Sequence, residues 1–149
     1  MIRKIITGAF FGFLALTISS TLYAQSDVIK ERQALMKSNS ADAKAIKAAV
    51  DAKDYATIET KAKDIMGNAE KIPSLFPKGS TVGKTKAKPE IWEKPDQFAA
   101  MPKKLGKAAS ELAAAAKAGN EADVNVKVKA LGAVCNSCHK EFRAAKYAE

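Results

Sequence analysis

Apolar side chains recur every three or four residues through four long segments of this chain, and this spacing constrains the fold more than any other feature. The segments lie within residues 27–50, 55–72, 98–115 and 124–142. Such spacing places apolar side chains on one face of an α-helix, and almost no stretch alternates as a strand would. The pattern predicts an all-α fold, an antiparallel four-helix bundle.

A stretch rich in proline, glycine and lysine separates the second segment from the third. It covers residues 72–95 and predicts one long crossing loop between helices 2 and 3. Phe76 and Trp92 within it are apolar enough to pack onto the bundle or to cover a bound group. Pro102 conflicts with the third segment, because proline in a helix interior removes a hydrogen bond. Either the third helix starts at Pro102 or it bends there.

The N-terminal residues have the pattern of an export signal. Arg3 and Lys4 precede an uncharged apolar run that ends near small residues. We expect cleavage after Ala24, so that residues 1–24 form a signal peptide and residues 25–149 form one periplasmic domain. An uncleaved membrane anchor is the alternative, although the run is short for a membrane-spanning helix. After cleavage no stable membrane insertion is expected.

The charge balance restricts the partners of the protein. The chain has 25 basic and 16 acidic side chains, and this excess of positive charge favours acidic partners. Nucleic acid is not expected, because an exported protein rarely meets it and the few aromatic residues form no stacking array. Lysines alternate with acidic residues along the helices, which is typical of a solvated face.

Both cysteines and the only histidine of the chain lie within one helical turn near the C-terminus. Cys135, Cys138 and His139 form the sequence Cys-Asn-Ser-Cys-His, which is the attachment pattern of c-type haem. In that chemistry the two thiols form thioether bonds and the imidazole ligates the iron. The pattern predicts one covalently attached haem c, with Cys135 and Cys138 as its thioether residues and His139 as an axial ligand.

Three other interpretations of this cluster stay open. A zinc site needs about four ligands, and the cluster supplies three of the usual soft kind. A redox-active dithiol usually belongs to a βαβ unit, which the sequence does not show. A structural disulfide across two residues would close a very short loop and stabilise the chain little. That last case would leave a haem-free helical interaction protein.

The chain resembles the class II cytochromes c, which are the cytochrome c′ family and its low-spin relatives. Three stretches carry the resemblance: VIKERQALM near the start, KPEIW in the crossing loop and CNSCHKEFR on the last helix. It covers nearly all of the chain after residue 24 and implies the same bundle with one haem c. In several family members a loop residue shortly before Pro-Glu contacts the haem, whereas this chain has lysines there, at positions 84, 86 and 88.

The resemblance also implies roles for residues around the haem. Arg32 and Gln33 match residues that face the haem, and a guanidinium is suited to bind a propionate. Met36 matches the position on the other side of the iron and is expected to be the second axial ligand. In some cytochromes c′ a methionine there only blocks the cavity, and this alternative stays open. Arg143 matches a basic residue beside the proximal imidazole.

The expected function depends on the sixth position of the iron. With Met36 as ligand, the resemblance implies a low-spin carrier of single electrons, which is the expectation. With an open position, it implies a high-spin cytochrome c′ that binds nitric oxide or carbon monoxide, which is the alternative. Neither transforms a substrate, so the protein is not expected to be an enzyme. Met66 and Met101 are expected to fill the core.

The expected partners follow from the same assignment. Lysines around the haem edge would steer an acidic redox partner protein in a weak, salt-sensitive encounter. The resemblance implies homodimers through the first two helices, and monomeric members share the same pattern.

Overall fold

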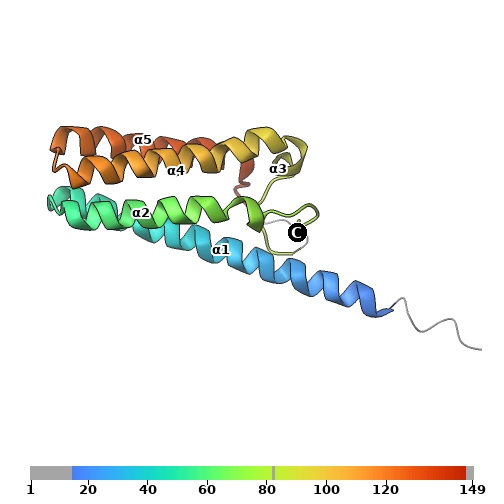
Figure 1. Ribbon diagram of the computed structural model, residues 1–149. Coiled ribbons are helices and arrows are strands. Elements are labelled where there is room, and N and C mark those ends of the chain that lie inside the picture. Colours follow the sequence, from blue (N-terminus) through green and yellow to red (C-terminus); the bar gives the residue numbers. More distant parts are fainter. Residues whose placement is uncertain (1–14, 82, 147–149) are drawn as a thin grey trace, which may run out of the picture.

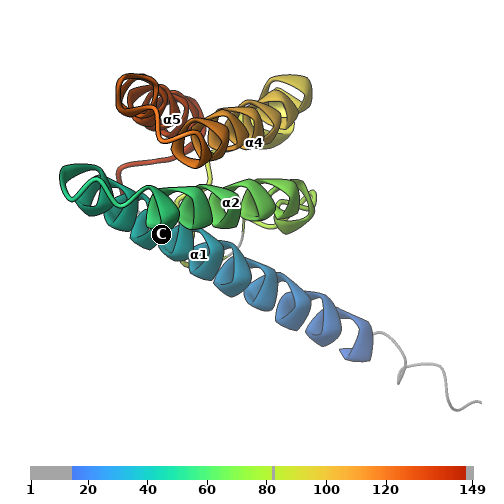
Figure 2. The same ribbon diagram turned by 60° about the vertical axis from the view of Figure 1, so that its left-hand side comes forward.

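Four long helices arranged in two layers form the body of the molecule (Figures 1 and 2). The computed structural model describes residues 15–81 and 83–146, with their side chains from residue 27 onward. Helices α1 and α2 form one layer and α4 and α5 the other. The helices of this part of the chain are α1 (Ala15–Asp51), α2 (Tyr55–Lys71), α3 (Glu90–Glu93), α4 (Pro95–Lys117) and α5 (Glu121–Phe142), with a 3₁₀ turn, η1 (Pro73–Leu75), after α2.

These helices confirm the predicted all-α bundle and its long crossing connection, in which η1 and α3 are the only helical turns described. Helix α1 begins at Ala15, upstream of residue 27, where the apolar pattern begins. Residues 1–14, which contain much of the expected export signal, lie outside the described residues. Over the part of the chain that the structure describes, none of the helices combines the length and apolar character needed to cross a membrane.

Polar side chains start two of the long helices. At the start of α2, Asp54 accepts hydrogen bonds from the Thr57 hydroxyl at 2.6 Å and the Thr57 N–H at 3.0 Å. At the start of α5, Asn120 accepts a hydrogen bond from the Asp123 N–H at 3.1 Å. Gly119 precedes it with φ of +66°, a conformation that favours glycine. Gly119 and Asn120 therefore separate α4 from α5.

The cap at Asp54 predicts a pH dependence of stability. The hydrogen bonds from the Thr57 hydroxyl and N–H lower the pKa of the Asp54 carboxyl below its ordinary value of 3.8. Because the folded-state pKa is the lower one, the stabilisation is present above the unfolded pKa and is lost as the pH falls through the folded pKa. In Asp54→Asn the amide oxygen keeps the cap but does not titrate.

The advantage of the natural protein over Asp54→Asn in unfolding free energy should therefore shrink as the pH falls from about 5 to about 2. Urea unfolding at a series of pH values measures this difference. A difference that stays constant over the whole series would contradict the assignment of the cap.

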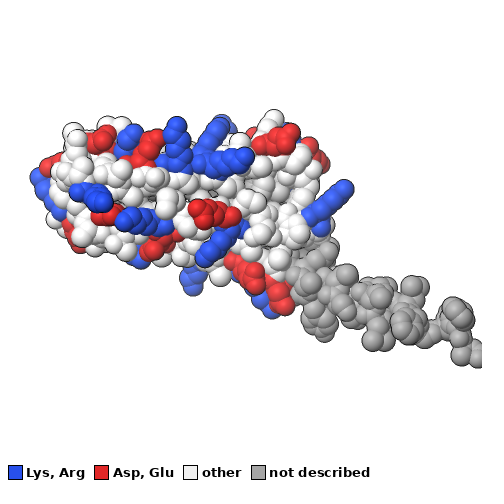
Figure 3. All heavy atoms as spheres, in the orientation of Figure 1, with Lys and Arg blue, Asp and Glu red and all other residues white. Residues whose placement is uncertain are grey.

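The surface carries charges of both signs. On the face shown in Figure 3, lysine and arginine side chains are interspersed with aspartate and glutamate. Some form ion pairs between helices, such as Lys53 with Glu121 at 2.8 Å and Lys127 with Glu111 at 2.9 Å. This mixture agrees with the predicted solvated faces, and surface pairs of this kind contribute little to stability.

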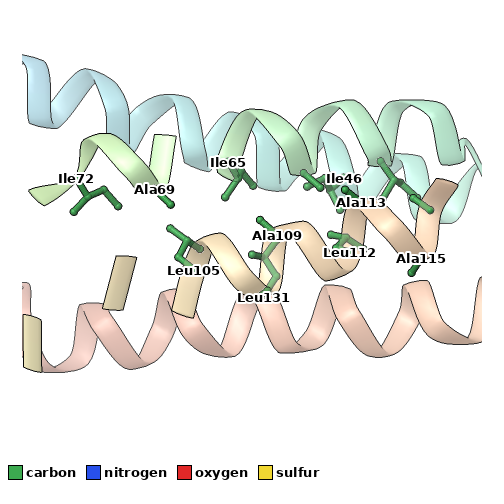
Figure 4. Packing of buried hydrophobic residues seen from close by; sticks show 14 of the residues in the cluster. Ile46, Ile65, Ala69, Ile72, Leu105, Ala109, Leu112, Ala113, Ala115 and Leu131 are labelled. Atoms are coloured by element: carbon green, nitrogen blue, oxygen red, sulfur yellow. The ribbon is translucent and has the colours of Figure 1, made fainter. Parts of the chain in front are cut away.

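Isoleucine and leucine side chains pack against alanines in the core of the bundle. Figure 4 shows Ile65 and Ala69 of α2 turned toward Leu105 and Ala109 of α4. Leu112 is fully buried, and burying such a side chain stabilises the fold by about 1.5–3 kcal/mol. Several of the most tightly buried large apolar side chains lie toward the end of the bundle where the α1–α2 and α4–α5 connections are, namely Ile46, Ile58, Leu112 and Val124. The other end of the bundle contains a cavity, which is described below.

Pro102 lies inside α4, which begins at Pro95. The alternative that the third helix starts at Pro102 is therefore wrong. Proline has no N–H, so Pro102 cannot donate to the carbonyl of Phe98 as an ordinary helical residue would. Its side chain is buried and lies in the wall of the cavity described below.

Candidate functional site

A cavity of about 490 Å³ occupies the end of the bundle away from the α1–α2 and α4–α5 connections. Its volume lies within the range of cofactor and small-molecule sites, about 300–1,000 Å³. Its walls come from α1, α4, α5 and the crossing loop, and they are mostly apolar. Among the described residues, they contain the cations Arg32, Lys86 and Arg143 but no aspartate or glutamate. The cavity therefore suits a large apolar group that carries negative charge at its edge.

Helix α5 brings the three residues of the Cys-Asn-Ser-Cys-His sequence to this cavity. Cys135, Cys138 and His139 all line it, and both cysteines are half-buried free thiols. Burial raises the pKa of the Cys138 thiol to about 11 and also raises that of Cys135, so both are protonated at neutral pH. Two free thiols one helical turn apart beside an imidazole are the groups that covalent haem attachment requires.

The surroundings of the His139 imidazole favour its neutral form. Partial burial and then the positive charge of Arg143 lower the pKa of His139 below its ordinary value. Neutral imidazole is the form that ligates a metal. Arg143 lines the cavity just beyond α5, and its backbone N–H donates to the His139 carbonyl at 3.1 Å. Within the described residues, no three histidine, cysteine, aspartate or glutamate side chains are grouped to hold a metal ion by themselves.

Helix α1 places Arg32, Gln33 and Met36 in one wall of the same cavity. The structure thus brings all six predicted site residues together. Met36 is half-buried and its thioether packs beside the core. Met66 packs against the core, as predicted. Met101 does so too but also lines the cavity, which the sequence analysis did not foresee.

Arg32 is buried, with 4% of its surface exposed, and its guanidinium binds the crossing loop. It donates hydrogen bonds to Ser80 Oγ at 2.6 Å, Leu75 O at 2.9 Å, Thr85 Oγ1 at 3.2 Å and Ser80 O at 3.4 Å. It also lies over the Phe76 ring, 4.0 Å from the centroid. Burial lowers its pKa to about 10, so the side chain stays charged at neutral pH. None of these partners is a carboxylate.

Aromatic rings close another side of the cavity. Phe76 contacts Phe98 edge to face with centroids 4.9 Å apart, and Phe98 contacts Phe142 in the same way at 5.3 Å. All three rings line the cavity. Trp92 instead anchors the loop, since its indole N–H donates to the carbonyls of Phe76 and Pro77 at 3.1 and 3.0 Å.

The sequence analysis missed several lining residues. Asn39, Ser40 and Ala43 continue the α1 stripe that contains Met36, and their helical spacing from Met36 could have identified them. Thr85 is buried in the crossing loop and also lines the cavity. No periodic pattern marks a residue of an irregular loop, so nothing in the sequence distinguished Thr85 from its neighbours.

The chain is similar to known cytochromes over most of its length. A family model described as Cytochrome C′ matches residues 27–143. Cytochrome c′ of Rhodopseudomonas palustris is 37% identical over 127 residues, 83% of this chain and 86% of that protein. Cytochrome c-556 of Agrobacterium fabrum is 35% identical over 147 residues, 96% of this chain and 97% of that protein. For cytochrome c′ of Rhodospirillum rubrum, identity is 44% over 84 residues, and the match spans only 57% of that protein.

Solved structures agree with this similarity. Cytochrome c′ from Thermochromatium tepidum superposes with a TM-score of 0.75 at 28% identity, covering 80% of this chain and 96% of that one. Another cytochrome c′, described as showing ligand-controlled dimer dissociation, gives the same values. The comparisons do not support the expected low-spin subgroup. Proteins of this family carry one covalently bound c-type haem, and the thiols and imidazole of the cavity fit that group. By its fold, its cavity and its sequence, the chain belongs to the cytochrome c′ family.

Proposed function

We propose that this cytochrome c′ holds its haem c in the cavity and binds nitric oxide or carbon monoxide at the iron, on the side away from His139. The match to the cytochrome c′ family model over residues 27–143 carries the proposal. It favours the gas-binding alternative of the sequence analysis over the electron carrier. When bound, haem c supplies an iron that exchanges single electrons and accepts a diatomic gas where its sixth position is open.

In this proposal α5 holds the haem. Cys135 and Cys138 form the thioether bonds, for which their reduced, protonated state in the cavity wall is the starting point. His139 would present a ring nitrogen to the iron, and desolvation together with the positive charge of Arg143 favours its neutral form. Arg143 also fixes the backbone at His139 through its N–H.

Arg32 and Gln33 act at the haem periphery. The cationic, acid-free wall around Arg32 would favour the negative charge of the propionates. Arg32 donates to the loop with all three nitrogens, so its effect on a propionate would come mainly from its charge. Gln33 is exposed at the rim, and its amide donates to the Lys84 carbonyl at 2.6 Å.

Met36 supports a second candidate function, a carrier of single electrons. Its thioether lies in the wall of the cavity that contains His139, and methionine is a common second ligand in cytochromes c. With Met36 on the iron there would be no open position for a gas. Such a carrier would use the excess of lysine and arginine side chains to meet an acidic redox partner.

The absorption spectrum of the holoprotein, made in a host that matures cytochromes c, separates the two functions. For the gas-binding protein we expect a high-spin ferric spectrum and a rapid carbon monoxide adduct of the ferrous form. Met36→Ala should keep the spectrum high-spin and tighten carbon monoxide binding on the order of tenfold, because it removes a side chain from the binding side. Met66→Ala, which changes a methionine outside the cavity, is the matched control.

An absorption band of a methionine thioether bound to ferric iron, if Met36→Ala abolishes it, would instead establish the electron carrier. A colourless protein from the same host would contradict both functions.

We also propose that residues 1–24 direct export, so that residues 25–149 work in the periplasm. The relative with ligand-controlled dimer dissociation supports a homodimer for this chain as well. With either function the protein binds a gas or carries electrons and does not convert a substrate, so we propose that it is not an enzyme.

A further inference from the structure

Residues 84–88 of the crossing loop, here called the strap, join α1 to the end of α5. On the α1 side, the Gln33 amide donates to the carbonyl of Lys84 at 2.6 Å. Arg32 Nη1 donates to the Thr85 hydroxyl oxygen at 3.2 Å. Gln33 and Arg32 lie one turn before Met36, so the strap is fixed to the same stretch of α1 that lines the cavity.

The other side of the strap caps the helix that carries His139. The Lys88 N–H donates to the Phe142 carbonyl at 3.1 Å, and Lys88 Nζ donates to the Glu141 carbonyl at 2.7 Å. In return, the Ala144 N–H donates to the Lys86 carbonyl at 2.8 Å. The last carbonyls of a helix have no intrahelical donors. The strap supplies donors to two of them, within one turn of His139.

The strap matters because α1 and α5 have little other contact. The extensive helix interfaces of the bundle are those of α2 with α4, α4 with α5 and α1 with α2, whereas α1 and α5 meet over only a few residues. The cavity lies between these two helices, where their direct contact is sparse. The two sets of hydrogen bonds therefore fix α1 relative to α5 at the cavity.

We propose that the strap sets how closely the Met36 side chain approaches the iron, with Thr85 and Lys88 as its positioning residues. Thr85 has only 2% of its surface exposed, and its hydroxyl oxygen also accepts from the Ala87 N–H at 3.1 Å. It therefore links the fold of the strap to Arg32. Lys88 is half-buried and fixes the opposite end. The proposal rests on the proposed function, because it concerns the binding side of the same iron.

The test measures carbon monoxide affinity of the ferrous holoprotein in Thr85→Val and Lys88→Met. Thr85→Val keeps the shape of the side chain but removes the hydroxyl, and Lys88→Met removes Nζ but keeps the backbone N–H. Without one of the hydrogen bonds of the strap, α1 is held less firmly against α5, and Met36 can move away from the gas-binding side at a lower cost in free energy. The dissociation constant for carbon monoxide should therefore fall on the order of fivefold, the usual effect of losing one hydrogen bond. If Met36 ligates the iron, the same titration measures its displacement.

Lys127→Met is the matched control, because Lys127 binds Glu111 away from the cavity. It should leave the dissociation constant unchanged. The effect of each strap variant should vanish when Met36→Ala is present, since the strap is proposed to act through Met36.

Two results would overturn the inference: an unchanged dissociation constant in a folded strap variant, or a change that persists fully with Met36→Ala. Both leave the proposed function intact, because the natural protein still has its haem and its gas reaction. Thermal unfolding is followed in parallel, since a role in stability alone would lower the melting temperature without changing the affinity. Should Thr85→Val not fold, Lys88→Met tests the same proposal from the other end.

Discussion

Protein in which Cys135 and Cys138 are both changed to serine should leave a cytochrome-maturing host with no covalently bound haem. The natural chain should keep one haem on denaturing electrophoresis, and the variant should keep none, because a hydroxyl does not form the thioether bond. Both thiols lie in the cavity wall and are half-buried, so the change to serine removes little packing. Haem staining and the mass of the denatured polypeptide measure the result.

Asn136→Ala and Ser137→Ala are the controls for this experiment. Both residues lie between the cysteines on α5 and are exposed, so the thiols and the helix remain. These variants should carry the full amount of haem. Covalent haem on the double serine variant would show that attachment uses other residues, and the site described here would then be wrong.

Arg32→Met should lower the free energy of unfolding by about 3 kcal/mol. The change removes one buried guanidinium that binds Leu75, Ser80 and Thr85. Hydrogen bonds to charged groups contribute about 1.5–3 kcal/mol each, and buried acceptors left without donors add to the loss. Urea unfolding with two independent probes measures the change.

Lys30→Met on the same helix is the comparison for Arg32. Lys30 is exposed and pairs with the exposed Asp27, so its replacement should change the free energy by no more than about 0.5 kcal/mol. Arg32→Lys should recover only part of the stability. A single ammonium group cannot donate to all the acceptors that the three nitrogens of the planar guanidinium bind. Equal stability of Arg32→Met and the natural protein would mean that the hydrogen bonds of Arg32 with the crossing loop do not stabilise the fold.

The fold was largely predictable from the sequence because the signals for it are local. Each long helix follows an apolar stripe, and Asp54 and Asn120 cap helices where polar residues precede the stripes. The grouping of Cys135, Cys138 and His139 in the cavity wall was predictable for the same reason, since the three residues lie within a single turn. A helix then needs only to face inward for all three to reach the cavity.

The rest of the site depends on contacts between distant segments. Arg32 and Thr85 are 53 residues apart, and no helical or strand period relates them. Sequence reasoning assigned Arg32 to a propionate, whereas the structure shows its hydrogen bonds going to the loop. It also placed Met101 only in the core, because a stripe shows which face is buried but not whether a cavity interrupts the core there.

The role of Met36 was the hardest to predict, for a physical reason. Helical spacing indicates that its side chain lies on the face of α1 that lines the cavity, but ligation requires a specific distance to the iron. That distance depends on how α1 sits against α5, which the crossing loop controls through hydrogen bonds that no short motif encodes.

The long sequence separation within the strap also bears on the order of folding. Its anchors join residues 53 apart on each side, Arg32 with Thr85 and Lys88 with Glu141. Contacts that close such long loops form late, after the local turns of the helices. We therefore expect a newly made chain to pass through a stage in which the helices are formed and the mouth of the cavity is still open. At that stage we expect both thiols to be more accessible than in the native protein, where they are half-buried.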